Sequence, residues 1–260
     1  MFDRPRILVC LLAAVFAPAV WAQQTLSEPQ ALRIAAAADL EPVLPAILAE
    51  FQTETGVHAE TSYQSSATLA TQILNGAPFD VFLAADLGFP QRVIAAGLAE
   101  ETEPVVYARG TLVLWARKDG RFHSLSMDSL KDPALKSVAM ADPEHAPYGR
   151  AAKAALEHLG LYEGLKSKLV IAENIAQTAQ YVESLNAELG LISLTSALTP
   201  RLRASGQYVL VPQDAYPAIL QGLVIVKHPS GTQPAHRFLD FLASAPIQHQ
   251  LEAGGLAPAK

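Results

Sequence analysis

The sequence predicts an α/β protein with two lobes, each holding a mostly parallel sheet flanked by helices. Short apolar runs alternate with segments that repeat apolar residues at helical spacing, and this alternation restarts near residue 111. No internal repeat and no low-complexity linker divides the 260 residues. We therefore expect two lobes that share strands, and not two domains joined by a linker.

The first part of the chain reads as three strand–helix pairs. Turn and cap residues bound them: Gly56 and Gly76 follow two expected helices, and Ser65 or Ser66 precedes one as its N-cap. The expected strands are 32–37, 57–63 and 80–86, and the expected helices are 41–56, 65–76 and 89–99.

The second part repeats the pattern and then returns to the first lobe. The segments 136–160 and 168–188 each read as strand, loop and helix. Further strands are expected at 111–117, 189–194, 208–212 and 220–227, with closing helices at 235–246 and 247–255. We assign residues 23–107 and 222–260 to the first lobe and residues 108–221 to the second.

Residues 1–22 have the pattern of a secretory signal peptide. Arg4 and Arg6 precede a short apolar run, and Ala22 is a small residue at the expected cleavage point. Cys10, the only cysteine, lies in this segment, so the mature chain has no thiol nucleophile and no thiolate ligand for a metal. We expect an exported protein, most simply one of a bacterial periplasm.

The charge balance argues against nucleic acid as a partner. The formal net charge is −6, and the sequence has neither a lysine run nor a basic patch interleaved with aromatic residues. A bound anion would have to be held by local dipoles and not by net charge.

Four turns between an expected strand and helix carry small or polar residues. A helix N-terminus leaves its first N–H groups unpaired and has a partial positive charge, so several such turns converging on one cleft would bind an oxyanion. Each turn taken singly is explained more simply as a cap of its own helix, but two in each half of the chain favour a site. The turns are 38–39, 65–67, 146–149 and 174–177.

The order of four blocks resembles the periplasmic molybdate-binding proteins of ABC importers. The blocks are AAAADL (35–40), YQSSATLATQILNGAPFDVFLAAD (63–86), ADPEHAPYGRAAKAAL (141–156) and AENIAQTAQYVESLNAELGLISL (172–194). The resemblance implies a type II periplasmic binding-protein fold, in which a cleft between two lobes traps a tetrahedral oxyanion, molybdate or tungstate. It also implies an inner-membrane ABC permease as partner, no enzymatic activity, no cofactor and a monomeric protein.

The resemblance also implies ligand-binding positions. Ser66 would bind through its hydroxyl and N–H, and Tyr148 and Ile175 through their backbone N–H groups. Two positions depart from the family pattern, since Asp39 stands where the family has a serine and Ser193 where it has a tyrosine. Neighbours in the same turns and alternative donors complete the candidate set: Ala38, Ser65, Gly149, Arg150, Asn174 and Gln221.

Asp39 leaves two interpretations open. As an N-cap, its carboxylate would accept the N–H groups of its own helix, and molybdate would bind through the remaining donors. Inside the cleft, it would repel a fully deprotonated anion and favour a protonated one, such as phosphate or arsenate. Arg150 is either a solvated residue or a cation that reaches across the cleft to Asp39 or to the ligand.

Other chemistry finds little support. Asp142, Glu144 and His145 match no zinc spacing and are expected to shape their loop, so a metal is expected only as part of the oxyanion. The serines lack the context of a hydrolase nucleophile. The competing functions are a periplasmic ligand sensor and an enzyme acting on a phosphate ester.

Overall fold

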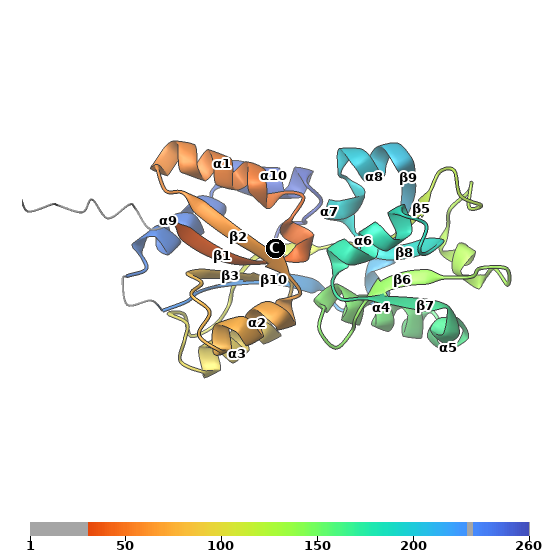
Figure 1. Cartoon of the computed structure of the whole chain (residues 1–260), viewed down its shortest axis with the longest axis horizontal. Coiled ribbons are helices and arrows are strands. Elements are labelled where there is room, and N and C mark those ends of the chain that lie inside the picture. Colours follow the sequence, from red (N-terminus) through yellow and green to blue (C-terminus); the bar gives the residue numbers. More distant parts are fainter. Residues whose placement is uncertain (1–30, 228–230, 260) are drawn as a thin grey trace, which may run out of the picture. The chain divides into compact units, whose positions relative to one another are not determined.

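The first sheet contains the N-terminal strands and one strand from the end of the chain. The computed structural model describes residues 31–227 and 231–259, so the expected signal peptide 1–22 lies outside the described residues. Strand β10 runs antiparallel between β3 and β4, while β1 pairs in parallel with β2 and β3, so four of the five strands point the same way (Figure 1). The order is β2 (Ala59–Gln64), β1 (Leu32–Ala37), β3 (Val81–Ala84), β10 (Ile219–Ile225) and β4 (Val105–Gly110).

The second sheet has the same topology. Three parallel strands are followed by an antiparallel one, β5, and an outer strand, β9, that pairs antiparallel with it. The order is β7 (Leu169–Ala172), β6 (Val138–Ala141), β8 (Leu189–Ser193), β5 (Leu112–Arg117) and β9 (Gly206–Leu210). The expectation of two mostly parallel sheets is therefore confirmed.

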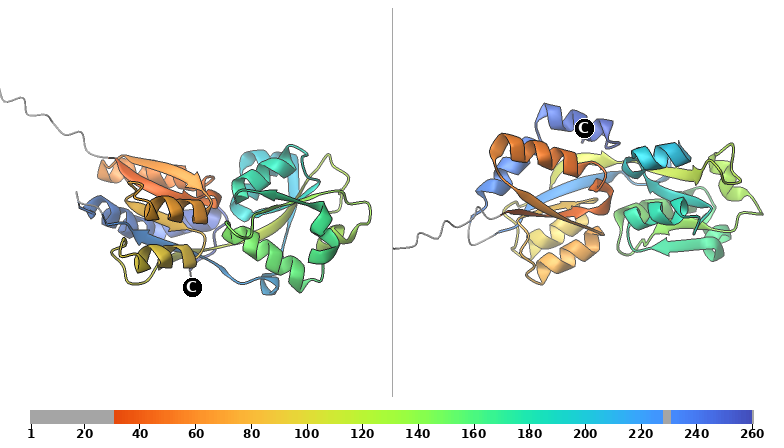
Figure 2. Two further views of the ribbon diagram at one scale, coloured as in Figure 1. Left: turned by 60° about the horizontal axis from the view of Figure 1, so that its bottom comes forward. Right: turned by 45° about the horizontal axis from the view of Figure 1, so that its top comes forward.

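Helices cover both faces of the first sheet (Figure 2). Alternate residues of a strand point to opposite faces, and in β1 Ile34 and Ala36 pack in one apolar cluster while Ala35 packs in another. The first cluster includes α1 (Leu44–Thr55), α9 (Gln233–Leu242) and α10 (Ala245–Ala253), and the second includes α2 (Ser66–Leu74) and α3 (Gly88–Ala95).

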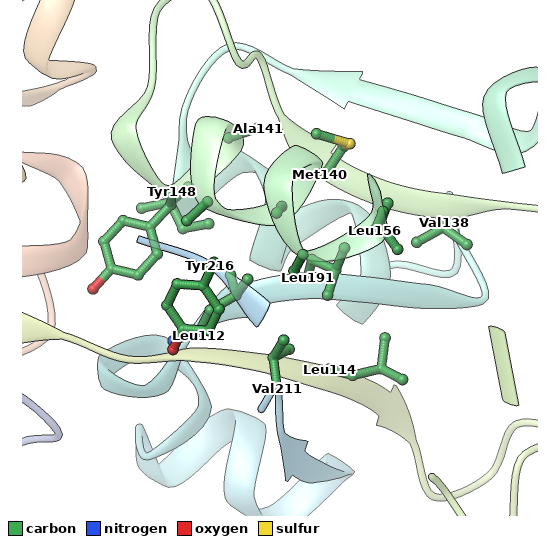
Figure 3. Packing of buried hydrophobic residues seen from close by; sticks show 14 of the residues in the cluster. Leu112, Leu114, Val138, Met140, Ala141, Tyr148, Leu156, Leu191, Val211 and Tyr216 are labelled. Carbon is green, nitrogen blue, oxygen red and sulfur yellow. The ribbon is translucent and has the colours of Figure 1, made fainter. Parts of the chain in front are cut away.

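The second sheet is covered in the same way. Leu112 and Leu114 of β5 face one cluster, and Val113 and Trp115 face the other. Figure 3 shows the first of these clusters, with Tyr148 at its edge and the phenol oxygen turned away from Leu156. This cluster includes α4 (Pro147–His158), α5 (Tyr162–Leu165) and the short turn η2 (Met127–Lys131), whereas the opposite one includes α6 (Ile175–Glu183), α7 (Leu194–Ala197) and α8 (Pro200–Ser205).

The chain passes between the sheets at two places. Thr111 alone separates β4 from β5, and residues 211–218, with the short turn η4 (Gln213–Ala215), separate β9 from β10. Strand β4 was not expected from the sequence. Its pairing with β10 extends the first sheet as far as Gly110. The division into lobes stays a prediction, and these crossings lie a few residues from the expected 107 and 222.

Candidate functional site

A small cavity lies where strands of both sheets lead into helices. Its volume is about 10 Å³, close to that of one water-sized sphere, so an anion with four oxygens enters only if the lining groups move apart. Seven of the eleven predicted residues line it, together with Ala37, Gln64, Ala85, Ala146 and Pro147. The seven are Ala38, Asp39, Ser65, Ser66, Tyr148, Asn174 and Ile175.

The two serines at the start of α2 have different roles. Ser65 is the N-cap, since its Oγ accepts the backbone N–H of Thr68 at 3.2 Å. Ser66 Oγ accepts the N–H of Ala85, which follows β3, at 3.1 Å. Because Ser66 Oγ already accepts this bond, its O–H remains as a donor for a ligand. Its backbone N–H, at the first position of α2, has no acceptor within the helix.

Helix α4 brings Tyr148 to the cavity. Pro147 occupies the first helical position, where a missing N–H costs nothing, and the Tyr148 N–H follows in the same unpaired turn. The phenol ring is 1 % exposed and packs against Gly110 of β4, where an added Cβ would lie 2.8 Å from Tyr148 Cζ. A side chain from the second sheet therefore fits against a glycine of the first.

Helix α6 contributes a backbone donor. Ile175 is its first residue, so its N–H also lacks an intrahelical acceptor. The Asn174 side chain also lines the cavity, and its Oδ1 accepts the N–H of Gln177 at 2.9 Å and caps the helix, which leaves Nδ2 as a donor.

Asp39 is not a helix cap. The short turn η1 (Ala38–Leu40) has Ala37 as its N-cap and no capping side chain, and the Asp39 carboxylate is completely buried in the cavity wall. Its Oδ2 accepts a hydrogen bond from Gln221 Nε2 at 2.5 Å. Burial raises the pKa of Asp39 to about 6, and the Gln221 hydrogen bond opposes this rise.

A buried chain of polar groups runs away from Asp39. Gln221 Oε1 accepts from the Tyr107 hydroxyl at 3.0 Å, so both ends of the Gln221 amide are used. Gln221 therefore positions Asp39 and is not among the residues that line the cavity, so its expected role as a ligand donor stays a prediction. Tyr107 has no local sequence signal, because its partner lies 114 residues away.

Ser193 is not part of the cavity wall. Its Oγ caps α7 by accepting the Ser196 N–H, and it lies 2.8 Å from Thr195 Oγ1. Thr195 Oγ1 in turn donates to the carbonyl oxygen of Asp39 at 2.7 Å. Ser193 is thus linked to the Asp39 backbone through Thr195. Nothing in the sequence indicated this role of Thr195.

Arg150 reaches from α4 to the first sheet, but its partner is not Asp39. Its guanidinium forms an ion pair with Asp86, which follows β3, and lies 5.3 Å from the ring centre of Phe89 in α3. Arg150 and Gly149 lie outside the cavity wall. An added Cβ at Gly149 would come within 2.7 Å of Asp142, so this glycine allows α4 to pack on the preceding loop.

The cavity wall contains no cation among the residues that the structure describes, and Asp39 is its only carboxylate.

Asp142 shapes its loop as expected, accepting the N–H of Glu144 and pairing with His145 Nδ1 at 2.8 Å. Residues 31–227 and 231–259 contain no metal-binding group of three or more His, Cys, Asp or Glu residues. No helix in those ranges is long and apolar enough to span a membrane.

Comparisons with known proteins identify the family and the fold of the chain. Residues 32–257 match the family described as bacterial extracellular solute-binding protein. The chain is 35% identical to the molybdate-binding protein ModA of Azotobacter vinelandii over 98% of both chains, and 36% identical to that of Rhodobacter capsulatus over 80% of this chain and 81% of the relative. The solved structure of the Azotobacter vinelandii periplasmic molybdate-binding protein superposes with a TM-score of 0.82 at 27% identity, covering 88% of this chain and 100% of that one.

Proposed function

Because the chain belongs to the family of bacterial extracellular solute-binding proteins, we propose that it is the periplasmic solute-binding component of an ABC importer and that it captures molybdate. Tungstate, which has the same shape and charge, is expected to bind as well. The relatives named above as molybdate-binding proteins support this choice of anion.

The observation that carries the proposal is the convergence of neutral donors on one cavity. The first turns of α2, α4 and α6 all border it, and each offers N–H groups and the positive end of a helix dipole. The Ser66 hydroxyl and the Tyr148 phenol add side-chain donors. Such a set binds an oxyanion without a lysine or an arginine.

Capture would proceed by closure of the two sheets around the anion. Ser66 belongs to the helices of the first sheet, whereas Tyr148 and Ile175 belong to those of the second. An open form offers only one half of the donors, so the anion stabilises the closed form by its extra contacts there. Thr111 and residues 211–218 are the proposed hinges.

A second candidate ligand is a protonated anion such as phosphate or arsenate. The buried Asp39 carboxylate in the cavity wall favours it, since an O–H of the ligand would donate to Asp39. The binding role, the ABC permease as partner, the monomeric state and the absence of a cofactor are parts of the same proposal.

Calorimetric titration of the purified protein with molybdate, tungstate, sulfate and phosphate tests the proposal. We expect tight binding of molybdate and tungstate, and weaker or no binding of sulfate and phosphate. Binding of phosphate in preference to molybdate would replace the first candidate by the second. Failure to bind any of the four anions would contradict both.

A further inference from the structure

We propose that this site takes up one proton with each anion, and that Asp39 Oδ1 shares that proton with an oxygen of the bound anion. Asp39 is thereby a specificity-determining residue that selects oxyanions whose oxygens are basic enough to share a proton. The inference rests on the proposed function, because it describes how the same cavity tells one anion from another.

The two carboxylate oxygens of Asp39 have different surroundings. Oδ2 is occupied by the Gln221 amide at 2.5 Å, whereas Oδ1 is buried without a hydrogen-bond partner among the described residues. The Tyr148 hydroxyl interacts with this carboxylate and lowers the pKa of Asp39, but it too is buried without a hydrogen bond of good geometry in the part of the chain that the structure describes. Both residues line the same cavity. An acceptor and a donor thus face the space that the anion would enter.

No cationic side chain acts on Asp39 among the described residues, and only hydrogen bonds from Gln221, Tyr148 and the backbone favour its ionised form. The titratable groups that act on it are two buried tyrosines, Tyr148 from α4 and Tyr107 from β4, and its charge raises the pKa of both in addition to the effect of burial. Strand β10 contributes the neutral Gln221. Helices α6 and α7 face the turn with the neutral Ile175 and Thr195.

Cations near this region are engaged elsewhere. Arg150, on the same helix as Tyr148, is paired with Asp86. On β2, burial raises the pKa of Tyr63, the Thr61 hydrogen bond opposes this rise and the charge of Glu41 adds to it, whereas Asp39 is not among the causes. A dianion that entered the cavity beside an ionised Asp39 would therefore meet a like charge that no cationic side chain offsets.

One proton removes this repulsion and creates a bond. A proton between Asp39 Oδ1 and an anion oxygen forms a charge-assisted hydrogen bond, and no bond of the anion is broken. The burial that already raises the pKa of Asp39 to about 6 in the ligand-free protein acts in the same direction. Molybdate oxygens are more basic than sulfate oxygens, so the shared proton favours molybdate although the two ions have the same charge.

Calorimetry in two buffers of different ionisation enthalpy counts the protons taken up on binding. Between pH 7 and 8.5, Asp39 is ionised in the ligand-free protein, and we expect about one proton per molybdate and an affinity that falls about tenfold per pH unit. Asp39→Asn supplies an N–H in place of the shared proton. The Asp39→Asn variant should take up no proton on binding molybdate, and its affinity should not change with pH.

Two further variants distinguish a loss of proton uptake from a general loss of affinity. Ser66→Ala removes a donor, so it should weaken binding but leave the proton count near one. Gln221→Met removes the bond that stabilises the ionised carboxylate, so the pH at which the affinity begins to fall should move upward. In Asp39→Asn, the affinity for sulfate should rise relative to the affinity for molybdate, and competition between the two anions measures this ratio.

Failure of anion binding and failure of proton sharing give different results. If the wild-type protein binds none of the anions at any pH, the proposed function fails. If it binds molybdate without proton uptake, only the shared proton is wrong. An unchanged proton count in Asp39→Asn would likewise assign the proton to another group.

Discussion

Gln221 Nε2 donates to Asp39 Oδ2 at 2.5 Å, and this bond joins two residues that are 182 positions apart and completely buried. Strand β10 enters the first sheet antiparallel to β3 and carries Gln221 to the turn that follows β1. The bond leaves Oδ1 as the carboxylate oxygen that has no hydrogen bond of good geometry among the described residues. The chemical character of the site therefore depends on how the last strand of the chain returns to the first sheet.

The buried carboxylate should make stability depend on pH. The pKa of Asp39 is raised from 3.8 to about 6 in the folded protein, so its contribution is fully present below pH 3.8 and is lost as the pH rises through 6. Relative to Asp39→Asn, the ligand-free wild type should lose about 2 kcal/mol of unfolding free energy between pH 4 and 7. Urea unfolding of both proteins at several pH values measures this difference. A constant difference across that range would show that Asp39 does not titrate there.

Ser66→Ala should weaken anion binding much more than Ser65→Ala. Ser66 loses a donor to a charged ligand, which costs about 1.5–3 kcal/mol, or about 10- to 100-fold in Kd. Ser65 only caps α2, so its replacement should cost about 1 kcal/mol of stability and leave Kd nearly unchanged. Calorimetry and thermal unfolding of the two variants make the comparison. Equal losses of affinity would contradict the assignment of ligand binding to Ser66 and of helix capping to Ser65.

Gly110→Ala should displace Tyr148 from the cavity. The added Cβ would lie 2.8 Å from Tyr148 Cζ, closer than real contacts allow, and 3.1 Å from Ile219, which is a tight contact. We expect a loss of affinity of at least tenfold and a destabilisation of about 1–3 kcal/mol, as for other overpacked sites. Gly164→Ala in α5 is the matched control, since nothing lies within 4 Å of its added Cβ. Normal binding by Gly110→Ala would show that the phenol position is not needed.

Removal of the Arg150–Asp86 ion pair should favour the open form. The pair joins α4 to the end of β3, and the Arg150 side chain is 43% exposed, so its contribution is at most about 1 kcal/mol. Arg150→Gln should raise Kd about two- to fivefold, and high salt should reduce the difference between variant and wild type. Lys131→Gln, which removes an exposed pair with Asp128 within a single turn, is the control. A larger effect at high salt would contradict a simple ion pair.

Much of the fold follows from local patterns in the sequence. The apolar run 32–37 and the helices capped by Ser65 and Gly56 lie where expected, because their signals involve neighbouring residues. Strand β4 was missed because VVYARG has no clear alternation and gains its place only by pairing with β10. The antiparallel insertion of β10 and β5 has no local signal.

The site was predicted in part. Ser66, Tyr148 and Ile175 were placed by their turns, and the structure brings them to one cavity. The partners of Asp39, Gln221 and Arg150 were not foreseen correctly, since each depends on a contact between distant segments: Asp39 with Gln221, Gln221 with Tyr107, and Arg150 with Asp86. A one-dimensional pattern indicates which residues open a helix, but not which side chain from another strand meets them.

One molybdate is expected to be held between Ser66 on one side and Tyr148 and Ile175 on the other. This arrangement can be examined in a crystal structure of the protein with molybdate, in which the molybdenum is located by its anomalous scattering. We expect a single strong peak within hydrogen-bonding reach, through its oxygens, of Ser66 Oγ, the N–H of Ile175 and the carboxyl of Asp39. A peak outside this cavity, or contacts from only one sheet, would contradict the account.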